Sequence, residues 1–120
     1  MNITGNGLHN FNRAGVGVSF EITDPLPMHP VHRLLIGESG WTPKQSYTKQ
    51  NLGMGFAFIA PKKIATEIVN LINTQQFEDG AIQAQIVGEV GKLGGSEKEL
   101  RTTLHKPYEG GKLDFVGYAN

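Results

Sequence analysis

Cysteine is absent from the 120 residues of this chain. No disulfide, thiolate nucleophile or zinc–cysteine site can therefore form, which fits a protein of the cytoplasm. No hydrophobic run approaches the roughly 20 residues that a membrane helix needs. The first residues also lack the basic and apolar regions of a signal peptide. We therefore expect a cytoplasmic protein without a membrane segment.

Net charge is also missing, since eleven basic residues balance eleven acidic ones. A near-neutral surface gives no bulk attraction to nucleic acid or to anionic lipid, so we expect neither as a partner. The length suits one small domain with one core, and the sequence contains no internal repeat or linker. We predict a single domain over residues 1–120.

Glycines and amides crowd residues 3–13. Two glycines flank Asn6, and Asn10 and Arg13 follow. Because glycine lacks a Cβ, such a loop can bring bare backbone N–H groups close to an anion. The Arg13 guanidinium could then clamp a phosphate or carboxylate. The same composition is typical of an ordinary surface turn, and spacing alone leaves both interpretations open.

Alternating apolar residues predict three strands, over residues 14–22, 51–60 and 81–90. The strand over 51–60 has the strongest pattern, and glycine and alanine leave one of its faces nearly bare. A helix, another backbone or a ligand would pack there. Residues 75–80 and 96–99 suit loops, although 96–99 could also form a helical turn. Residues 100–120 predict a hairpin that turns at 109–111.

Prolines begin three predicted helices. The first covers residues 30–36 and ends at Gly37 or Gly40. The second has Thr42 as its N-cap and runs to residue 47 or 49. The third covers 61–73 and carries an apolar stripe. Strands and helices are mixed without strict βαβ alternation, which predicts the α+β class, with a mixed, largely antiparallel sheet flanked by helices.

Other candidate chemistry is sparse. His29 and His32 are three residues apart, but Pro30 separates them and the pair need not share a helix face. Packing or surface histidines are therefore favoured over ligands, and we predict no metal site. Serines lack the context of a nucleophile elbow, and the scattered carboxylates have no spacing that assigns them acid–base roles.

Three motifs occur in order along the chain: Ile3-Thr4-Gly5-Asn6-Gly7-Leu8 with Asn10-Phe11-Asn12-Arg13, then Asn51-Leu52-Gly53-Met54-Gly55, then Ile86-Val87-Gly88-Glu89-Val90. Their order and gaps resemble the C-terminal domain of aminoimidazole ribonucleotide (AIR) synthase, also called phosphoribosylformylglycinamidine cyclo-ligase. The resemblance covers residues 2–93, and residues 94–120 form a longer tail than the family usually has. It implies an AIR synthase C-terminal-domain-like fold, truncated at its N-terminal side.

The resemblance also implies a function in purine biosynthesis. In the family this domain helps to form the cleft in which formylglycinamidine ribonucleotide is cyclised with ATP and Mg²⁺. It implies substrate-binding roles for Thr4, Gly5, Asn6, Gly7, Asn10 and Arg13, with Asn2, Asn51, Gly53 and Gly55 as further cleft candidates. It assigns no catalytic residue.

Two departures from the family pattern matter for function. Asn2 stands where the family motif has histidine, and Asn6 stands where it has its middle glycine. An amide cannot act as an acid or base near neutral pH. The ATP-binding half of the family enzyme is also missing, so we expect no ATP turnover and no cofactor for the chain alone. Expected partners are a ribonucleotide ligand and either a separate N-terminal half or further copies of the chain. The alternative is a non-catalytic binding or oligomerisation module.

Overall fold

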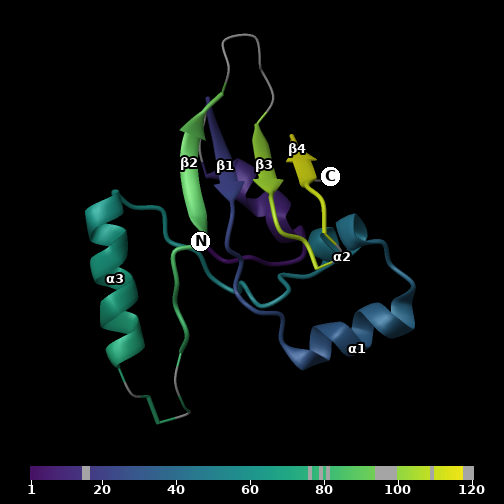
Figure 1. Cartoon of the computed structure of the whole chain (residues 1–120), viewed down its shortest axis with the longest axis horizontal. Helices are drawn as coiled ribbons and strands as arrows, with labels where there is room; N and C mark the ends of the chain where they lie inside the picture. Colours follow the sequence, from purple (N-terminus) through teal and green to yellow (C-terminus); the bar gives the residue numbers. More distant parts are fainter. Residues whose placement is uncertain are drawn as a thin grey trace.

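A computed structural model describes residues 1–14, 17–75, 77–78, 80, 82–93, 100–108 and 110–117. Within these residues four strands form one mixed sheet in the order β2-β1-β3-β4 (Figure 1). The strands are β1 (Val18–Ile22), β2 (Gly88–Lys92), β3 (Arg101–Leu104) and β4 (Leu113–Val116). The β1–β2 and β3–β4 pairs are antiparallel and the β1–β3 pair is parallel. The predicted α+β class with a mixed, largely antiparallel sheet is confirmed.

The helices described are the 3₁₀ helix η1 (Gly7–Arg13) and the α-helices α1 (Pro30–Ser39), α2 (Pro43–Lys49) and α3 (Lys62–Thr74). All three predicted α-helices are confirmed, each beginning at or next to its proline. Gly40 ends α1 in the left-handed conformation, with φ of 70°. Thr42 caps α2 through a capping box with Gln45.

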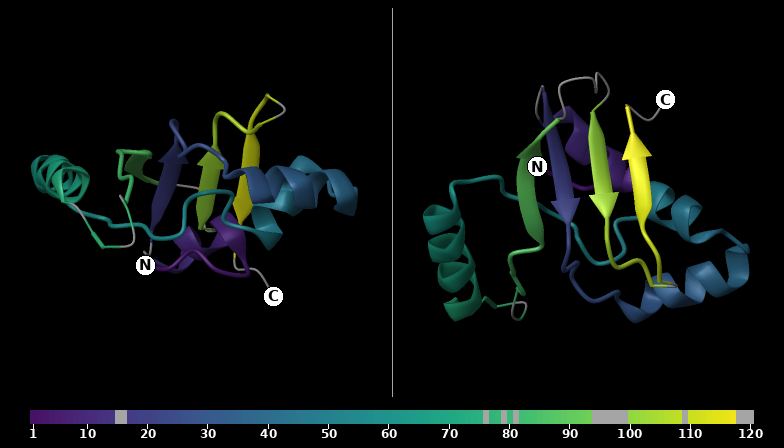
Figure 2. Two further views of the ribbon diagram at one scale, coloured as in Figure 1. Left: turned by 90° about the horizontal axis from the view of Figure 1, so that it is seen from below. Right: turned by 45° about the horizontal axis from the view of Figure 1, so that its top comes forward.

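The core lies between one face of the sheet and η1 (Figure 2). Phe20 from β1, Leu104 from β3 and Phe115 from β4 point to this face and are almost fully buried. Leu8 and Phe11 of η1 pack against them. Because burial of such side chains is the main favourable term in folding, η1 is an essential second layer.

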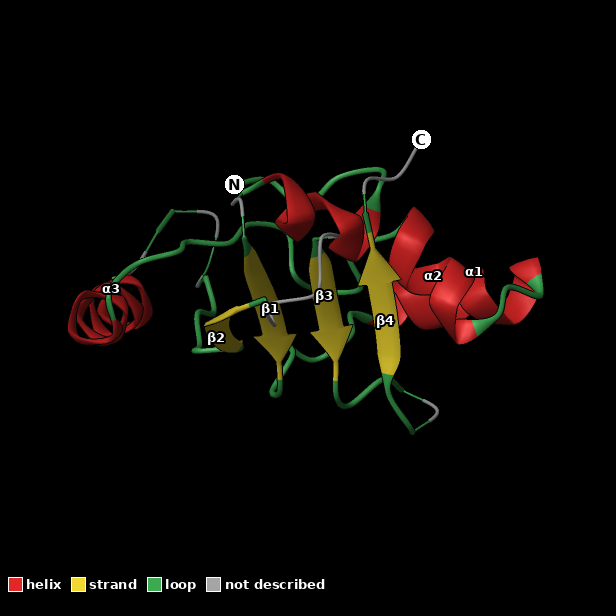
Figure 3. Cartoon of the chain, turned by 90° about the horizontal axis from the view of Figure 1, so that it is seen from above, coloured by secondary structure: helices red, strands yellow, loops and turns green. Residues whose placement is uncertain are grey.

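Helix α3 stands apart from the sheet, beyond β2 (Figure 3). None of its residues is buried, and Leu71 is 61% exposed. Its apolar stripe, the segment 56–60 and the segment 82–87 line a groove of about 770 Å³ beside β1 and β2. The helix therefore flanks the sheet as predicted, but it leaves apolar surface open to solvent.

The prediction of a strand over residues 51–60 is wrong. Leu52 and Gly53 have φ of 50° and 108° and form a turn instead. Beyond the turn, Ile3 N–H donates to Gly55 O at 2.9 Å and Ala57 N–H donates to Met1 O at 2.8 Å. Residues 1–3 therefore pair with this segment through one isolated β-bridge, between Asn2 and Phe56, and not through a strand ladder. Alternating apolar residues favour an extended backbone, but a strand also needs a neighbouring strand that pairs with it along its length.

The prediction of a strand over 81–90 is correct from Gly88 onward and wrong for residues 82–87, while Ala81 lies outside the described residues. Before Gly88 there is no strand ladder: Val87 O accepts from Thr23 N–H and Asp24 N–H, and side chains hold the preceding residues. Asn73 binds both backbone groups of Ala84 at 2.8 Å, and Gln85 Nε2 donates to Asp24 O at 2.7 Å. The earlier strand, predicted over 14–22, begins at Val18, and Gly15 and Val16 lie outside the described residues.

The predicted C-terminal hairpin is confirmed, with Arg101 opposite Val116 and Leu104 opposite Leu113. Glu109 at its predicted tip lies outside the described residues, as do residues 96–99. Among the helices described, none is long and apolar enough to cross a membrane.

Candidate functional site

Residues 3–13, the predicted anion loop, divide into two parts. Residues 4–7 form a turn in which Gly7 N–H donates to Thr4 O at 2.8 Å. From Gly7 onward the chain is helical, so the prediction of a loop is wrong for that part. The apolar Leu8 and Phe11 explain the difference, because a 3₁₀ helix places residues three apart on one side and here turns both into the core.

Gly7 and Asn10 serve the fold in this structure. Gly7 has φ of 51°, and a Cβ there would lie 1.7 Å from Tyr47 O at the end of α2. The close backbone approach that glycine permits is thus to a helix. The buried Asn10 Nδ2 donates to Gly7 O at 2.8 Å, which holds the turn against η1.

Thr4, Gly5 and Asn6 have a different environment. Thr4 and Gly5 are exposed, and a Cβ at Gly5 would meet nothing within 4 Å. The backbone N–H groups of these three residues donate no hydrogen bond to any part of the chain that the structure describes. Arg13 is exposed at the other end of η1, about 12 Å along a helix that rises roughly 2 Å per residue. The structure does not bring Arg13 to the turn.

The further cleft candidates are Asn2, Asn51, Gly53 and Gly55, and only some of them lie near the turn at residues 4–7. Asn2 forms the isolated bridge with Phe56, which brings it beside Gly55. Asn51 Oδ1 accepts from Gly53 N–H at 3.0 Å, so its Nδ2 remains to donate elsewhere. A Cβ at Gly53 would lie 2.4 Å from Pro27 O, which gives this glycine a packing role.

Thr4 and Asn51 line a hollow of about 310 Å³ between the turn and helices α1 and α2. Its apolar wall consists of Ile3, Leu35 and Trp41, and its remaining lining residues are His32, Lys49 and Gln50. We call this the α1–α2 hollow. Every polar side chain in this set can donate a hydrogen bond, and the set includes no aspartate or glutamate. Most of the lining surface is nonetheless apolar.

Two contacts order the α1–α2 hollow. The Lys49 ammonium lies 5.6 Å from the centroid of the Trp41 ring, within range of a cation–π interaction. His32 Nδ1 lies 2.5 Å from Gln50 Oε1. If Nδ1 carries the proton, it donates to the amide oxygen, and Nε2 of the neutral ring is left as an acceptor. The buried Gln50 Nε2 has no partner among the described residues.

His29 and His32 do not act together. His29 accepts from Val31 N–H at 3.2 Å as the N-cap of α1, whereas His32 turns to Gln50. Among the residues described, no group of three or more histidine, aspartate or glutamate side chains is placed to hold a metal ion.

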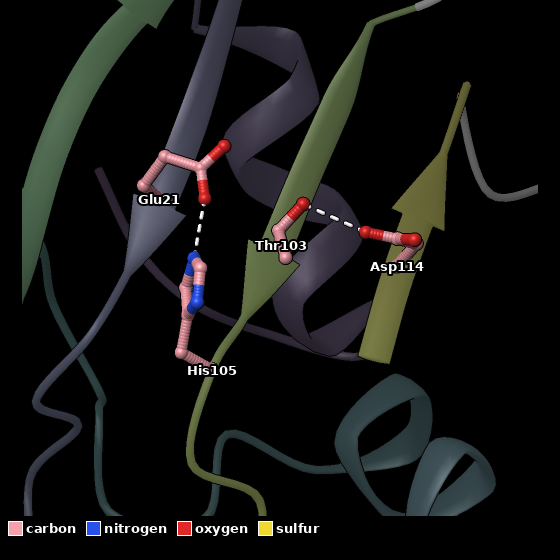
Figure 4. A network of polar contacts seen from close by, with 4 residues as sticks. All are labelled: Glu21, Thr103, His105 and Asp114. Carbon is pink, nitrogen blue, oxygen red and sulfur yellow. Dashed lines mark hydrogen bonds and ion pairs between the residues drawn. The ribbon is translucent and has the colours of Figure 1, made fainter. Parts of the chain in front are cut away.

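A row of polar side chains crosses the sheet face opposite η1 (Figure 4). His105 Nε2 lies 2.5 Å from Glu21 Oε2, and Thr103 Oγ1 donates to Asp114 Oδ1 at 2.7 Å. Glu21, Thr103 and Asp114 are register partners on three neighbouring strands. Cross-strand pairs of this kind stabilise a sheet, which is sufficient reason for the row.

His9 belongs to η1 and turns its ring toward Phe115 of β4, and it does not line the α1–α2 hollow. Its ring meets Phe115 edge-on, with centroids 5.2 Å apart. Burial, and then the positive charge of Lys44, lower the pKa of His9 from its ordinary value of 6.5. His9 therefore favours its neutral form.

Sequence reasoning missed five residues that line the α1–α2 hollow: His32, Leu35, Trp41, Lys49 and Gln50. They come from two helices and the link before α2, so no local spacing joins them. One signal was available, since Lys49 and Gln50 directly precede the motif that begins at Asn51.

Fold and site together define a small α+β domain in which a glycine-containing turn borders a largely apolar hollow whose polar side chains can all donate hydrogen bonds. No family model matches the chain. The chain is 35% identical over 89 residues to the phosphoribosylformylglycinamidine cyclo-ligase of Methanopyrus kandleri. Those residues are 73% of this chain and 24% of that protein, so the chain spans about a quarter of its relative. The predicted resemblance is confirmed, and the chain is AIR synthase-related.

Proposed function

We propose that this chain is the C-terminal-domain-like part of an AIR synthase that works in purine biosynthesis in the cytoplasm. The observation that carries the proposal is the 35% identity with a phosphoribosylformylglycinamidine cyclo-ligase over 73% of the chain. The complete enzyme would use ATP to activate the formyl oxygen of formylglycinamidine ribonucleotide. An amine of the substrate would then close the imidazole ring, with release of ADP and phosphate.

In this proposal the chain supplies one wall of the substrate cleft. The free backbone N–H groups of Thr4, Gly5 and Asn6 and the adjoining α1–α2 hollow face the ribonucleotide. Gly7, Asn10 and Gly53 fix the shape of this wall through their internal contacts. Arg13, at the far end of η1, would reach the ligand only from another side.

The partner in this proposal is an ATP-binding half supplied by the remaining part of such an enzyme. The chain matches 24% of its relative, so most of that protein has no counterpart here. The groove of about 770 Å³ has an apolar lining that includes Phe58 (62% exposed) and Val90 (47% exposed). Contiguous apolar surface of this size on a small protein commonly marks an interface.

ATP and Mg²⁺ belong to the partner half in this proposal. Mg²⁺ is usually held by one or two carboxylates together with the nucleotide phosphates, and in this proposal the partner half binds the nucleotide. The work of this chain is to bind and orient the ribonucleotide and to exclude water from it.

The test is reconstitution. The chain would be mixed or co-expressed with an ATP-binding half and supplied with formylglycinamidine ribonucleotide. We expect phosphate and aminoimidazole ribonucleotide to form only when both halves are present. Robust ATP turnover by the purified chain alone would refute the proposal, as would a failure of the two halves to co-purify.

A non-catalytic module is the second candidate. The observation that favours it is that Gly7 and Asn10, two of the motif residues, are occupied by internal contacts. The amides Asn2 and Asn6 also replace the histidine and glycine of the family motif. A chain that binds a ribonucleotide and self-associates, yet gives no turnover with any ATP-binding half, would identify this second function.

A further inference from the structure

We infer that Asn6 is a site of spontaneous deamidation, and that opening of the turn at residues 4–7 controls the rate of the reaction. The inference does not depend on the proposed function. The chain contains a single Asn-Gly step, at Asn6 and Gly7. Asn6 also stands where the family motif has its middle glycine, a residue that has no side-chain amide to lose.

Deamidation of an Asn-Gly step is a reaction of the chain with itself and then with water. The Gly7 backbone nitrogen gives its proton to hydroxide and attacks Cγ of Asn6. A C–N bond forms, ammonia leaves, and the two residues are joined in a five-membered succinimide. Water then opens the ring at either carbonyl, which gives aspartate or isoaspartate. Glycine favours the attack because no Cβ shields its nitrogen.

The closed turn holds the Gly7 nitrogen away from Cγ of Asn6. The ψ angle of Asn6 is 7°. This angle brings the Gly7 nitrogen nearly into line with the Asn6 nitrogen and turns it away from the Cβ that carries Cγ. The same Gly7 N–H donates to Thr4 O at 2.8 Å. Ring closure therefore requires a rotation about ψ of Asn6 that breaks this hydrogen bond.

Neighbouring contacts oppose that rotation. Gly7 is buried, and a Cβ on it would lie 1.7 Å from Tyr47 O at the end of α2. Asn10 Nδ2 donates to Gly7 O at 2.8 Å, and His9 N–H donates to Asn6 O at 3.1 Å. The reaction thus needs a local opening that separates the turn from α2, and its rate follows the population of that open state.

The isoaspartate product does not fit the closed turn. Isoaspartate continues the main chain through its side-chain carboxyl, which adds one carbon to the backbone directly before Gly7. The close approach of Gly7 to Tyr47 O leaves no room for the displaced backbone. A chain that has reacted should therefore stay open at this turn and unfold at a lower urea concentration.

The experiment measures two rates on the full unaltered chain, in native buffer and in urea. Peptide mapping by mass spectrometry follows the conversion of Asn6, and hydrogen exchange detected by NMR follows the Gly7 N–H. We expect the native structure to slow the conversion by about tenfold or more. Because both processes require the Gly7 N–H to leave Thr4 O, the two slowing factors should agree within about threefold.

Three variants identify the site and the contacts that control it. Asn10→Ala removes the donor to Gly7 O and should speed conversion in native buffer by about threefold or more, without changing the rate in urea. Asn70→Ala is the matched control, because Asn70 is exposed on α3, and it should leave both rates unchanged. Asn6→Gly should abolish conversion at this position.

The inference is overturned if conversion is as fast in native buffer as in urea, or if it is slowed while the Gly7 N–H exchanges without protection. Equal effects of the Asn10 and Asn70 variants would show that the contacts of the turn do not control the reaction. Should Asn10→Ala fail to fold, the comparison of the two rates in the unaltered chain decides the question. Neither rate involves turnover, so this result and that of the reconstitution are separate.

Discussion

Gly5 and Gly7 belong to one motif, but different contacts constrain them. At Gly7 the backbone has positive φ and the space for a Cβ is filled by Tyr47 O. At Gly5 the surrounding space is empty. The family resemblance assigned both to substrate binding, since a sequence motif cannot separate a glycine that packs against protein from one that faces a ligand. Only the position of α2 makes this distinction.

This difference gives a direct test at the residue scale. Gly7→Ala should lower the free energy of unfolding by about 2–4 kcal/mol, because the new methyl group overlaps the Tyr47 carbonyl and the residue has positive φ. Gly5→Ala should change it by less than about 0.5 kcal/mol. Urea unfolding followed by circular dichroism measures both. Equal effects would show that Gly7 does not pack against α2.

His9 predicts how stability depends on pH. Its folded pKa lies below the ordinary value of 6.5 that the unfolded chain would have. The unfolded chain therefore binds the proton more readily, so stability should fall as the pH drops below about 6.5 and should be fully present above it.

The measurement is urea unfolding at pH 7.5 and pH 5.5. In His9→Gln, which cannot titrate, we expect a smaller difference in unfolding free energy between the two pH values than in the unaltered chain. An unchanged difference would assign the acid sensitivity to other groups.

At the scale of elements, the helices were predictable because their signals are local. A proline at the first turn, a threonine N-cap and a terminal glycine are read within a few residues. The segment 51–60 was not predictable, because a strand requires a neighbour elsewhere in the chain. Contacts between distant parts of the chain were equally unpredictable at Asn12. Its Nδ2 donates hydrogen bonds to Phe115 O and Gly117 O, which are 103 and 105 residues away.

The α2 capping box is testable at this scale. Thr42 Oγ1 accepts from Gln45 N–H at 3.3 Å, and Gln45 Oε1 accepts from Thr42 N–H at 2.9 Å. Thr42→Ala should cost about 1 kcal/mol of stability, and Thr42→Ser should recover most of it. Thr66→Ala on exposed α3 is the control, and should be neutral or slightly stabilising because alanine is the better helix former. A similar response at both sites would contradict the cap.

The molecule as a whole leaves several large apolar side chains exposed. Leu34 on α1, Leu71 on α3 and Phe58 in the groove are each more than 60% exposed. Sequence analysis led us to expect partners, either an N-terminal half or more copies of the chain. The alternation in 51–60 and the stripe of α3 showed which residues are apolar, but only the structure shows that α3 stands off the sheet.

We expect the purified chain to associate with itself as concentration rises, because the groove has no other partner present. Light scattering or sedimentation would measure this. Phe58→Glu should shift the equilibrium toward monomer by placing a charge in the groove, whereas Leu34→Glu on α1 should shift it less. A chain that stays monomeric at high concentration would contradict the expectation.

The hydrogen bonds from Asn12 to the end of β4 also affect the rate of folding. They span almost the whole chain, and contacts of such large sequence separation form slowly because a long loop must close first. During synthesis, residues 3–13 emerge from the ribosome before residues 115–117, which provide their anchor. The turn at residues 4–7 should therefore be among the last parts of the described chain to become ordered.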